Sequence, residues 1–385
     1  MKSVLHIALV APGGYSTKPF MDAFLNNGFS EYRAFDYQLN RFNTDKATMQ
    51  KMLIKEAQDM KPDIIFAQVQ GSDVIDLETW QAISKIAFTV NFTFDIRTQS
   101  QTQWMYNLAG VIGLVCFSNQ EDVDECKRYD YNNCMVMQSS CDMDFYKPIH
   151  PPIDVKHKGG VVFIGNNFEN TNLIFPKSRE RREMVEFLKK EFPDKFVVRG
   201  NGWPDGKLIG QNEEVNTYLC SLIAISHNNF DNELYTSDRL WRIMATGTMC
   251  LTKYFKGIEK WFIDGVHLHW WKTFDELRMK IIYCLDYPND SYQVGIRGMI
   301  EVRNNHTWTA RIKEMMIFIQ TLNIPVKVQG DACLKAGAHV IDGVIPQAFD
   351  EHLAGKPCDC GRLRGLWSEC NCGNKEFQFR WEENI

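Results

Sequence analysis

Short apolar runs alternate along the chain with longer segments in which apolar residues recur every three or four positions. Runs of the first kind are typical of buried parallel strands, and the longer pattern is typical of amphipathic helices. In the first 150 residues the apolar runs cover 63–69, 88–94, 111–117 and 134–138, and helical patterns cover 46–60 and 120–128. The alternation predicts an α/β fold, with a parallel sheet and helices on both of its faces.

The alternation is interrupted by a segment rich in proline and glycine. Three prolines between positions 148 and 152 prevent a regular element, and a glycine pair at 159–160 precedes the next apolar run. A second series of strand and helix patterns follows, and a length of 385 residues is typical of two or three domains. We therefore predict two Rossmann-like domains and a small cysteine-rich C-terminal extension, with bounds at 1–150, 151–325 and 326–385.

The segment 220–247 combines a strand pattern, a polar loop and a helix pattern. His227 lies in the loop, Ser237 can cap the helix, and Gly247 ends it. Arg239 and Arg242 lie three positions apart near the start of the helix, where the helix dipole disfavours cations. Their placement is favourable if an anion binds the free N–H groups at that end. The alternative is that both arginines are solvated on a surface helix.

Polar residues also follow the predicted strands of the first domain, where ligands of parallel sheets bind. Gly13 and Gly14 follow the first strand, but their spacing is not that of a dinucleotide-binding G-x-G-x-x-G motif. Gln70 follows the strand pattern at 63–69. Asp95 and Arg97 follow the next one and lie on one face, because side chains along a strand alternate with a period of two. They form either a simple ion pair or part of a catalytic site.

The composition bears on nucleic-acid binding, on membrane insertion and on the cellular compartment of the protein. The formal net charge is −5, so the chain has no global basic field for binding nucleic acid. No apolar run is long enough to span a bilayer, and the N-terminal run leads into a glycine turn instead of a signal-peptide cleavage site. Several of the 12 cysteines lie in apolar runs, which is typical of reduced and buried thiols; examples are Cys116, Cys220, Cys250 and Cys284. We therefore expect a cytoplasmic protein.

The C-terminal extension carries four cysteines in two close pairs, within the sequence CDCGRLRGLWSECNCG. In a reducing compartment, Cys358, Cys360, Cys370 and Cys372 suit one tetrahedral zinc ion of structural type. Surface thiols or two disulfides are the alternatives. The arginines and the tryptophan between the pairs suit a contact with nucleic acid, with another chain or with the first domain.

Three motifs in the second half of the chain resemble those of a known enzyme family. SDRLWRIMATGTMCLT, DELRMKIIYCLDYP and NNHTWTAR are similar to the C-terminal half of group-1-like glycosyltransferases of the spore-maturation-protein type. The resemblance covers residues 160–319, and a looser one extends over the N-terminal half. It implies the GT-B fold, in which two Rossmann-like domains face each other across a cleft.

The resemblance also implies roles for individual residues. A nucleotide-sugar donor, expected to be UDP-linked, would bind to the second domain, and a hydroxyl acceptor would bind to the first. Asp95 would orient or deprotonate the acceptor hydroxyl, and His227 would lie near the sugar as the second catalytic candidate. Arg239, with Arg242, would neutralise the leaving diphosphate without a metal ion. The other implied donor-binding residues are Gly165, Asn166, Asn201, Gly202, Tyr235, Ser237, Gly247, His306 and Thr307. The implied acceptor-side residues are Gly13, Gly14, Tyr15, Gln70 and Arg97.

One departure from the family leaves alternatives open. Many retaining relatives have a glutamate five residues before the glycine that ends the helix, and this chain has Arg242 there. An inactive nucleotide- or sugar-binding scaffold is therefore one alternative to a retaining hexosyl- or pentosyltransferase. The other is a phage-type enzyme that glycosylates hydroxylated bases of DNA in an infected bacterium. The cysteine-rich extension favours this second alternative and the acidic net charge disfavours it, and the sequence does not identify the acceptor.

Overall fold

The computed structural model describes residues 2–9, 16–94, 96, 99–148, 160–168, 175–204 and 206–322, except for the side chains of 99–103. The chain divides into one unit over Met1–Gln329 and another over Gly330–Ile385. All described residues belong to the first unit, and the predicted extension over 326–385 lies outside them.

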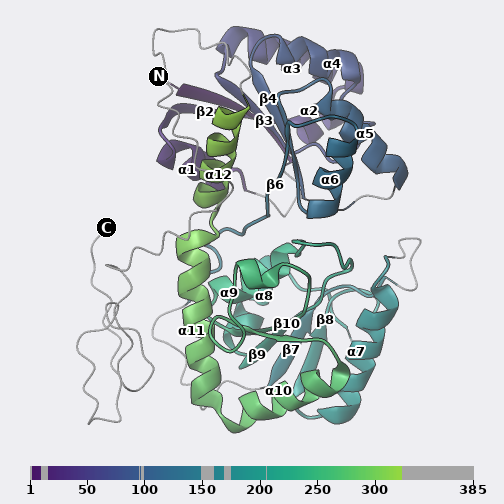
Figure 1. Ribbon diagram of the computed structural model, residues 1–385, viewed down its shortest axis with the longest axis vertical. Helices are drawn as coiled ribbons and strands as arrows, with labels where there is room; N and C mark the ends of the chain where they lie inside the picture. The colour runs from purple at the N-terminus through teal and green to yellow at the C-terminus, as the bar shows by residue number, and fades with distance from the viewer. Residues whose placement is uncertain are drawn as a thin grey trace, which may run out of the picture. The chain divides into compact units, whose positions relative to one another are not determined.

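The first sheet has six strands in the order β2-β1-β3-β4-β5-β6, and every neighbouring pair is parallel (Figure 1). The strands are β1 (Lys2–Ala8), β2 (Phe29–Asp36), β3 (Ile64–Ala67), β4 (Phe88–Thr93), β5 (Leu114–Phe117) and β6 (Cys134–Val136). The helices between them are α1 (Lys18–Asn26), α2 (Tyr37–Asn43), α3 (Lys46–Met60), α4 (Leu77–Ser84), α5 (Gln99–Ala109) and α6 (Gln120–Arg128). The strands and helices predicted for this half are confirmed. The sequence did not indicate β2, because this edge strand is largely exposed and has no apolar run.

The last described helix, α12 (Trp308–Thr321), packs against the first sheet together with α1 (Figure 1). Ile312 and Met315 are fully buried in one cluster with Val4 of β1 and Phe24 of α1. Burial of such side chains stabilises a fold by about 1.5–3 kcal/mol each. Helices α2–α6 cover the opposite face of the sheet. The predicted bounds assign α12 to the second domain by sequence position, whereas its side chains complete the core of the first.

The second sheet has five parallel strands in the order β11-β10-β9-β7-β8. The strands are β7 (Val161–Ile164), β8 (Phe196–Arg199), β9 (Ile223–Ser226), β10 (Met249–Lys253) and β11 (His269–Trp271). The helices are α7 (Ser178–Glu191), α8 (Gln211–Leu219), α9 (Asp238–Ala245), the short 3-10 helix η2 (Ile258–Lys260), α10 (Phe274–Asp286) and α11 (Pro288–Asn305). Buried residues of α8 and α9 pack on one face and those of α7 and α10 on the other. The predicted α/β fold with two Rossmann-like domains is confirmed.

Both sheets reverse their strand order next to their first strand. β1 lies between β2 and β3, and β7 lies between β8 and β9. In the first sheet, the connection after β1 runs to one side and the connection after β3 runs to the other. The connections after β7 and β9 diverge in the same way in the second sheet, and each divergence opens a crevice beyond the carboxyl ends of the strands. Ligands of open parallel sheets bind in such crevices. The topology places the expected ligand sites after β1 and β3 in the first domain and after β7 and β9 in the second.

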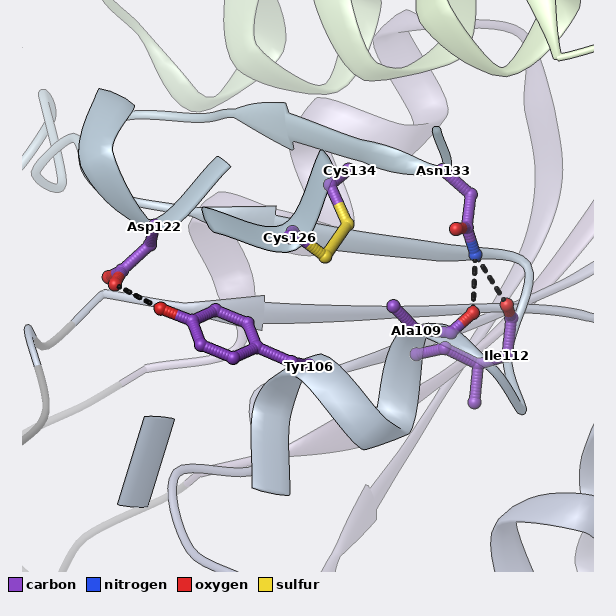
Figure 2. The surroundings of a disulfide bond; sticks show 7 residues. All are labelled: Tyr106, Ala109, Ile112, Asp122, Cys126, Asn133 and Cys134. Atoms are coloured by element: carbon purple, nitrogen blue, oxygen red, sulfur yellow. Dashed lines mark hydrogen bonds between the residues drawn. A yellow bond between two sulfur atoms is a disulfide. The ribbon is translucent and has the colours of Figure 1, made fainter. Parts of the chain in front are cut away.

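A disulfide joins Cys126 of α6 to Cys134 of β6 (Figure 2). In the same region the hydroxyl of Tyr106 donates a hydrogen bond to Asp122 at 3.1 Å. The side-chain amide nitrogen of Asn133 donates to two carbonyl oxygens, those of Ala109, the last residue of α5, and of Ile112, which follows the helix. These contacts tie the last strand of the first sheet to its neighbouring helices. The sequence did not indicate this disulfide.

The other described cysteines are free thiols. Cys116, Cys250 and Cys284 are buried as expected, and burial raises the pKa of each thiol, which makes them unreactive. The expectation of burial is wrong for Cys220, which is exposed because it lies just after the C-terminus of α8. Among the residues that the structure describes, no helix is both long and apolar enough to cross a bilayer.

Candidate functional site

A cavity of about 370 Å³ lies at the carboxyl ends of strands from both sheets. Leu9, Gln68 and Phe94, which follow β1, β3 and β4, line it from the first domain. Ser237 and Asp238, at the start of α9, line it from the second domain. Small-molecule sites in proteins span about 300–1,000 Å³, so the cavity can hold a substrate.

The first domain contributes three aromatic side chains to the cavity wall, together with polar ones. Phe20 of α1, Phe94 after β4 and Trp308 of α12 all line the cavity. The ring centroids of Phe20 and Trp308 are 4.2 Å apart. Aromatic rings offer apolar contacts to a ligand, and the second domain adds polar and charged side chains to the wall.

The loops after β7 and β8 contact each other closely. Four predicted donor-side residues, Gly165 and Asn166 after β7 and Asn201 and Gly202 after β8, are brought together here. The backbone N–H of Asn201 donates to the side-chain oxygen of Asn166 at 2.9 Å. Gly202 has a φ of +81°, and a Cβ there would lie 2.5 Å from the carbonyl oxygen of Asn167. Only glycine fits such a backbone without strain, so the loop conformation depends on it.

Arg239 projects from the first turn of α9 toward the ends of β7 and β9. Its Nε donates to the carbonyl oxygen of Ile164 at 2.5 Å. Its Nη1 donates to the carbonyl oxygen of His227 at 3.1 Å and to the hydroxyl of Ser237 at 3.3 Å. The guanidinium carbon lies 5.3 Å from the centroid of the Phe163 ring. Arg239 is not among the residues that line the cavity, but it donates to Ser237, which is one of them.

Arg181 of α7 lies beside Arg239, although the arginine-rich segment around it is typical of a solvated helix face. Its side chain is 2% exposed. Nη2 donates to the carbonyl oxygen of His227 at 2.6 Å, and Nη1 donates to that of Asn166 at 3.2 Å. Its guanidinium carbon lies 5.7 Å from the Phe163 centroid. Arg181 therefore holds the ends of β7 and β9 from the side opposite α9.

The spacing of apolar residues along α7 contains the signal for this burial. Met184, Val185 and Leu188 are the buried apolar residues of the helix, and Arg181 precedes the first two by three and four positions. Residues with that spacing share one face of a helix. The arginine-rich composition of the segment concealed the pattern, because Arg179 and Arg182 on the other faces are solvated or partly so.

Arg242 belongs to a separate, compensated cluster. Its Nη1 lies 3.2 Å from Glu214, its Nη2 pairs with Asp238, and its guanidinium carbon lies 5.6 Å from the Tyr146 ring centroid. The Tyr146 hydroxyl donates to Glu214 at 2.9 Å. Burial by itself would lower the pKa of Arg242, but the two carboxylates raise it well above its usual value. Arg242 lines the cavity as a cation whose charge is balanced, whereas Arg239 has no carboxylate partner among the residues that the structure describes.

Asn228 fixes the loop before α9, and the sequence analysis did not single it out. Its amide nitrogen donates to the carbonyl oxygen of Tyr235 at 3.1 Å, and its amide oxygen accepts from the backbone N–H of Ser237 at 3.1 Å. Tyr235 and Ser237 both line the cavity. The available signal was an asparagine in the loop directly after a buried strand, a position at which side-chain amides commonly hold backbone groups.

His227 contributes to this region through its backbone. Its side chain is 1% exposed and is not among the residues that line the cavity. In the described structure neither ring nitrogen has a hydrogen-bond partner, and Nε2 lies 3.9 Å from Glu180. Burial lowers the pKa of His227 to about 4, although Glu180 favours the cation. The ring is therefore neutral at neutral pH, while its carbonyl oxygen accepts from both arginines.

Three further predicted donor-side residues hold the ends of helices. Thr307 caps α12, its hydroxyl accepting from the backbone N–H of Ala310 at 3.2 Å. His306 stacks on Trp241, with ring centroids 5.1 Å apart. Gly247 follows α9 with a φ of +76°. None of the three is among the residues that line the cavity.

On the acceptor side, Gln68 lines the cavity and Gln70 does not. Gln70 instead donates to the carbonyl oxygen of Phe92 at 2.9 Å, and its amide oxygen lies 3.1 Å from the Thr93 hydroxyl. Gln68 pairs with Nε2 of the buried His6 at 2.9 Å. The remaining first-domain candidates, which lie outside the described residues, are Gly13, Gly14, Tyr15, Asp95 and Arg97.

A metal site is not seen in the part of the chain that the structure describes. No group of three or more histidine, cysteine or acidic residues is arranged there to hold an ion. The four cysteines of the predicted zinc site, Cys358, Cys360, Cys370 and Cys372, lie outside the described residues, and that site stays a prediction.

Residues 179–317 match a family model described as glycosyl transferase-like. This part of the chain is therefore similar to that family. The matched segment runs from α7 into α12 and includes Arg181, Asn228, Arg239 and Arg242. No curated protein matched the whole sequence significantly.

The matched segment lies within a fold that is shared with solved glycosyltransferases. HepE of Anabaena, solved with UDP and glucose, is 12% identical with a TM-score of 0.59, over 84% of this chain and 100% of HepE. A glycosyltransferase of Rickettsia africae is 11% identical with a TM-score of 0.57, over 84% and 99% of the two chains. Sucrose-phosphate synthase of Thermosynechococcus elongatus is 10% identical with a TM-score of 0.56, over 84% and 99%. These similarities establish the two-domain GT-B fold.

Proposed function

We propose that the protein is a glycosyltransferase that moves a sugar from a UDP-linked donor to a hydroxyl acceptor, with retention of configuration at the sugar. The observation that carries the proposal is the cavity between the carboxyl ends of two parallel sheets, with the start of α9 in its wall. Its support comes from the family match over 179–317 and from the fold shared with HepE, which was solved with UDP and glucose.

The donor diphosphate binds at the start of α9 in this proposal. Ser237 and Asp238 line the cavity there, and the free N–H groups of a helix start bind anions. Arg239 lies behind Ser237 and adds a positive charge that no described carboxylate balances. Fixed donors and charges aimed at a leaving diphosphate lower the barrier to its departure. The nucleoside lies against the loops after β7 and β8, whose close approach to each other depends on glycines such as Gly202.

The acceptor binds against the aromatic wall of the first domain. Phe20, Phe94 and Trp308 offer apolar ring faces, which suit the C–H face of a sugar ring or another planar group. Asp95 follows Phe94 in the sequence and is the proposed base for the acceptor hydroxyl. The proposal thus divides the cavity into a charged donor half and an aromatic acceptor half.

The first test is donor binding and turnover. Purified protein is titrated calorimetrically with UDP, GDP and dTDP, and then incubated with the matching nucleotide sugars and a panel of acceptors. Products are identified by mass spectrometry. We expect UDP to bind and one UDP-sugar to be turned over. Failure to bind any of the three diphosphates would contradict the proposal.

The same experiment separates the alternatives. Binding of a diphosphate without turnover on any acceptor would favour an inactive nucleotide-binding scaffold, for which Arg242 and its two carboxylate partners are the specific observation. Turnover only on DNA with hydroxylated bases would favour the phage-type enzyme. Turnover on a free or polymeric sugar acceptor would support the aromatic acceptor half described here.

A further inference from the structure

Arg181 and Arg239 form a pair of adjacent cations at the switch point of the second sheet. They come from different helices, α7 and α9, and meet between the ends of β7 and β9. Both donate to the same acceptor, the carbonyl oxygen of His227, at 2.6 and 3.1 Å. Both guanidinium groups also lie over the Phe163 ring. The positive charge of Arg239 lowers the pKa of Arg181 further than burial already does.

Within the described part of the chain, neither cation of this pair has a carboxylate partner. Among the described residues, no carboxylate lies within ion-pair distance of Arg181 or Arg239, although most other buried or half-buried cations of the region have one. Lys177 and Lys253, for example, both pair with Glu180. Buried charges are costly unless they are paired, and two like charges side by side add to the cost. The arrangement is favourable only when an anion completes it.

The carbonyl oxygens at this edge explain why two cations are needed. The last peptides of parallel strands direct carbonyl oxygens toward the ligand crevice, where their partial negative charge repels an anion. The two arginines bind three of these oxygens, those of Ile164, Asn166 and His227. They thereby convert a repulsive strand edge into an attractive one. Since Arg181 is 2% exposed, it acts from behind the loops without touching the ligand.

We propose that Arg181 is a positioning residue that makes the donor site selective for a diphosphate over a neutral nucleoside. This inference rests on the proposed function, in which the donor diphosphate lies at the start of α9. Charge acts over several ångströms in a site with little water, so Arg181 stabilises the diphosphate through Arg239 and the carbonyl oxygens that it holds. A purely structural role would affect the diphosphate and the nucleoside alike.

The test compares UDP with uridine in three variants. Arg181→Gln removes the positive charge but keeps an N–H group that can donate a hydrogen bond to a carbonyl oxygen. Arg181→Lys keeps the positive charge. Arg179→Gln is the matched control, because Arg179 lies on the same helix with an 80% exposed side chain that pairs with Glu183. UDP affinity is measured by calorimetry and uridine affinity by ligand-observed NMR. If the wild type prefers another diphosphate in the donor panel, that diphosphate and its nucleoside replace the pair.

We expect Arg181→Gln to weaken UDP binding about tenfold and uridine binding less than about twofold. Arg181→Lys should keep most of the wild-type preference for UDP, and Arg179→Gln should keep all of it. Equal weakening of both ligands by Arg181→Gln, or no change in either, would overturn the inference. If Arg181→Gln does not fold, Arg181→Met is measured in its place, and if neither folds the role is structural and the inference fails. Wild-type protein that binds no diphosphate would overturn the proposed function instead.

Discussion

A Cβ atom at Gly200 would lie 2.5 Å from the carbonyl oxygen of Gly165. Gly200 also has a φ of +122°, a conformation that other residues rarely adopt. The end of β8 therefore approaches the end of β7 more closely than any residue with a side chain allows. This approach sets the shape of the loops against which we place the nucleoside.

Gly200→Ala should lower the free energy of unfolding by about 2–4 kcal/mol, because it combines a forbidden backbone angle with a backbone clash. Gly210→Ala is the matched control, since a Cβ at Gly210 meets no atom within 4 Å. The control should change stability by less than about 1 kcal/mol. Urea denaturation of the two variants measures the difference, and equal stabilities would show that the loops adapt.

Arg239→Ala should weaken binding of the donor diphosphate by about 1.5–3 kcal/mol, the range for hydrogen bonds to charged groups. The reason is that Arg239, which has no carboxylate partner in the described structure, hydrogen-bonds Ser237 in the cavity wall. Calorimetry with UDP checks the value, and Arg33→Ala, an exposed arginine paired with Glu56 in the first domain, is the control. Unchanged affinity in a folded Arg239→Ala protein would remove the assignment.

Asp95→Asn should reduce turnover far more than donor affinity, because the proposed role of the carboxylate is toward the acceptor. The measurement is kcat with the active donor and acceptor, next to calorimetric binding of UDP. Asn keeps the size of the side chain, so folding should be unaffected. If the variant turns over at the wild-type rate, Asp95 is only one half of an ion pair with Arg97.

Protein stability should fall as the pH decreases from about 6.5 toward about 4. Burial lowers the pKa of His6, His227 and His306 to about 4 each, from 6.5 for an exposed histidine. Between these values the unfolded chain binds protons that the folded chain does not, so their contribution is complete above pH 6.5 and is lost below it. Each histidine contributes a slope of about 1.4 kcal/mol per pH unit.

Urea denaturation at several pH values in this range measures the slope. His306→Phe keeps an aromatic ring next to Trp241 and should reduce the slope by about 1.4 kcal/mol per pH unit, whatever its effect on absolute stability. The same slope in the variant and in the wild type would mean that His306 titrates normally in the folded protein.

Protein purified without added metal should contain one zinc ion per chain, held by the four cysteines from Cys358 to Cys372. Cys370→Ser should lose the zinc, while UDP binding at Arg239 stays intact because a closed zinc site is structural. Elemental analysis and calorimetry check both parts. A metal-free wild-type protein, or a disulfide between the cysteine pairs under reducing conditions, would argue against the site.

The sequence predicted the fold well because parallel sheets that are buried on both faces leave continuous apolar runs. The run at 63–69 contains β3, and the one at 88–94 contains β4. β2 escaped the prediction because an exposed edge strand lacks such a run. Local pattern therefore reveals the central strands of a sheet better than its edges.

Side-chain roles were harder to predict, because they depend on contacts between segments far apart in the sequence. Ser237 and Asp238 were recognised as a helix start from local pattern, and they line the cavity. Arg181 was not recognised as buried, since its burial depends on the ends of β7 and β9. His306 and Thr307 follow a motif of the family, but their contacts are made with a helix end and with Trp241.

The packing of α12 on the first sheet has a consequence for biosynthesis. N-terminal domains generally fold first as a chain leaves the ribosome. Here Ile312 and Met315 belong to the first-domain core, so that core stays incomplete until the entire second domain has been translated. The first domain must therefore keep an apolar surface exposed while the second domain is being synthesised. A chain that is truncated before α12 would be released from the ribosome with that surface uncovered.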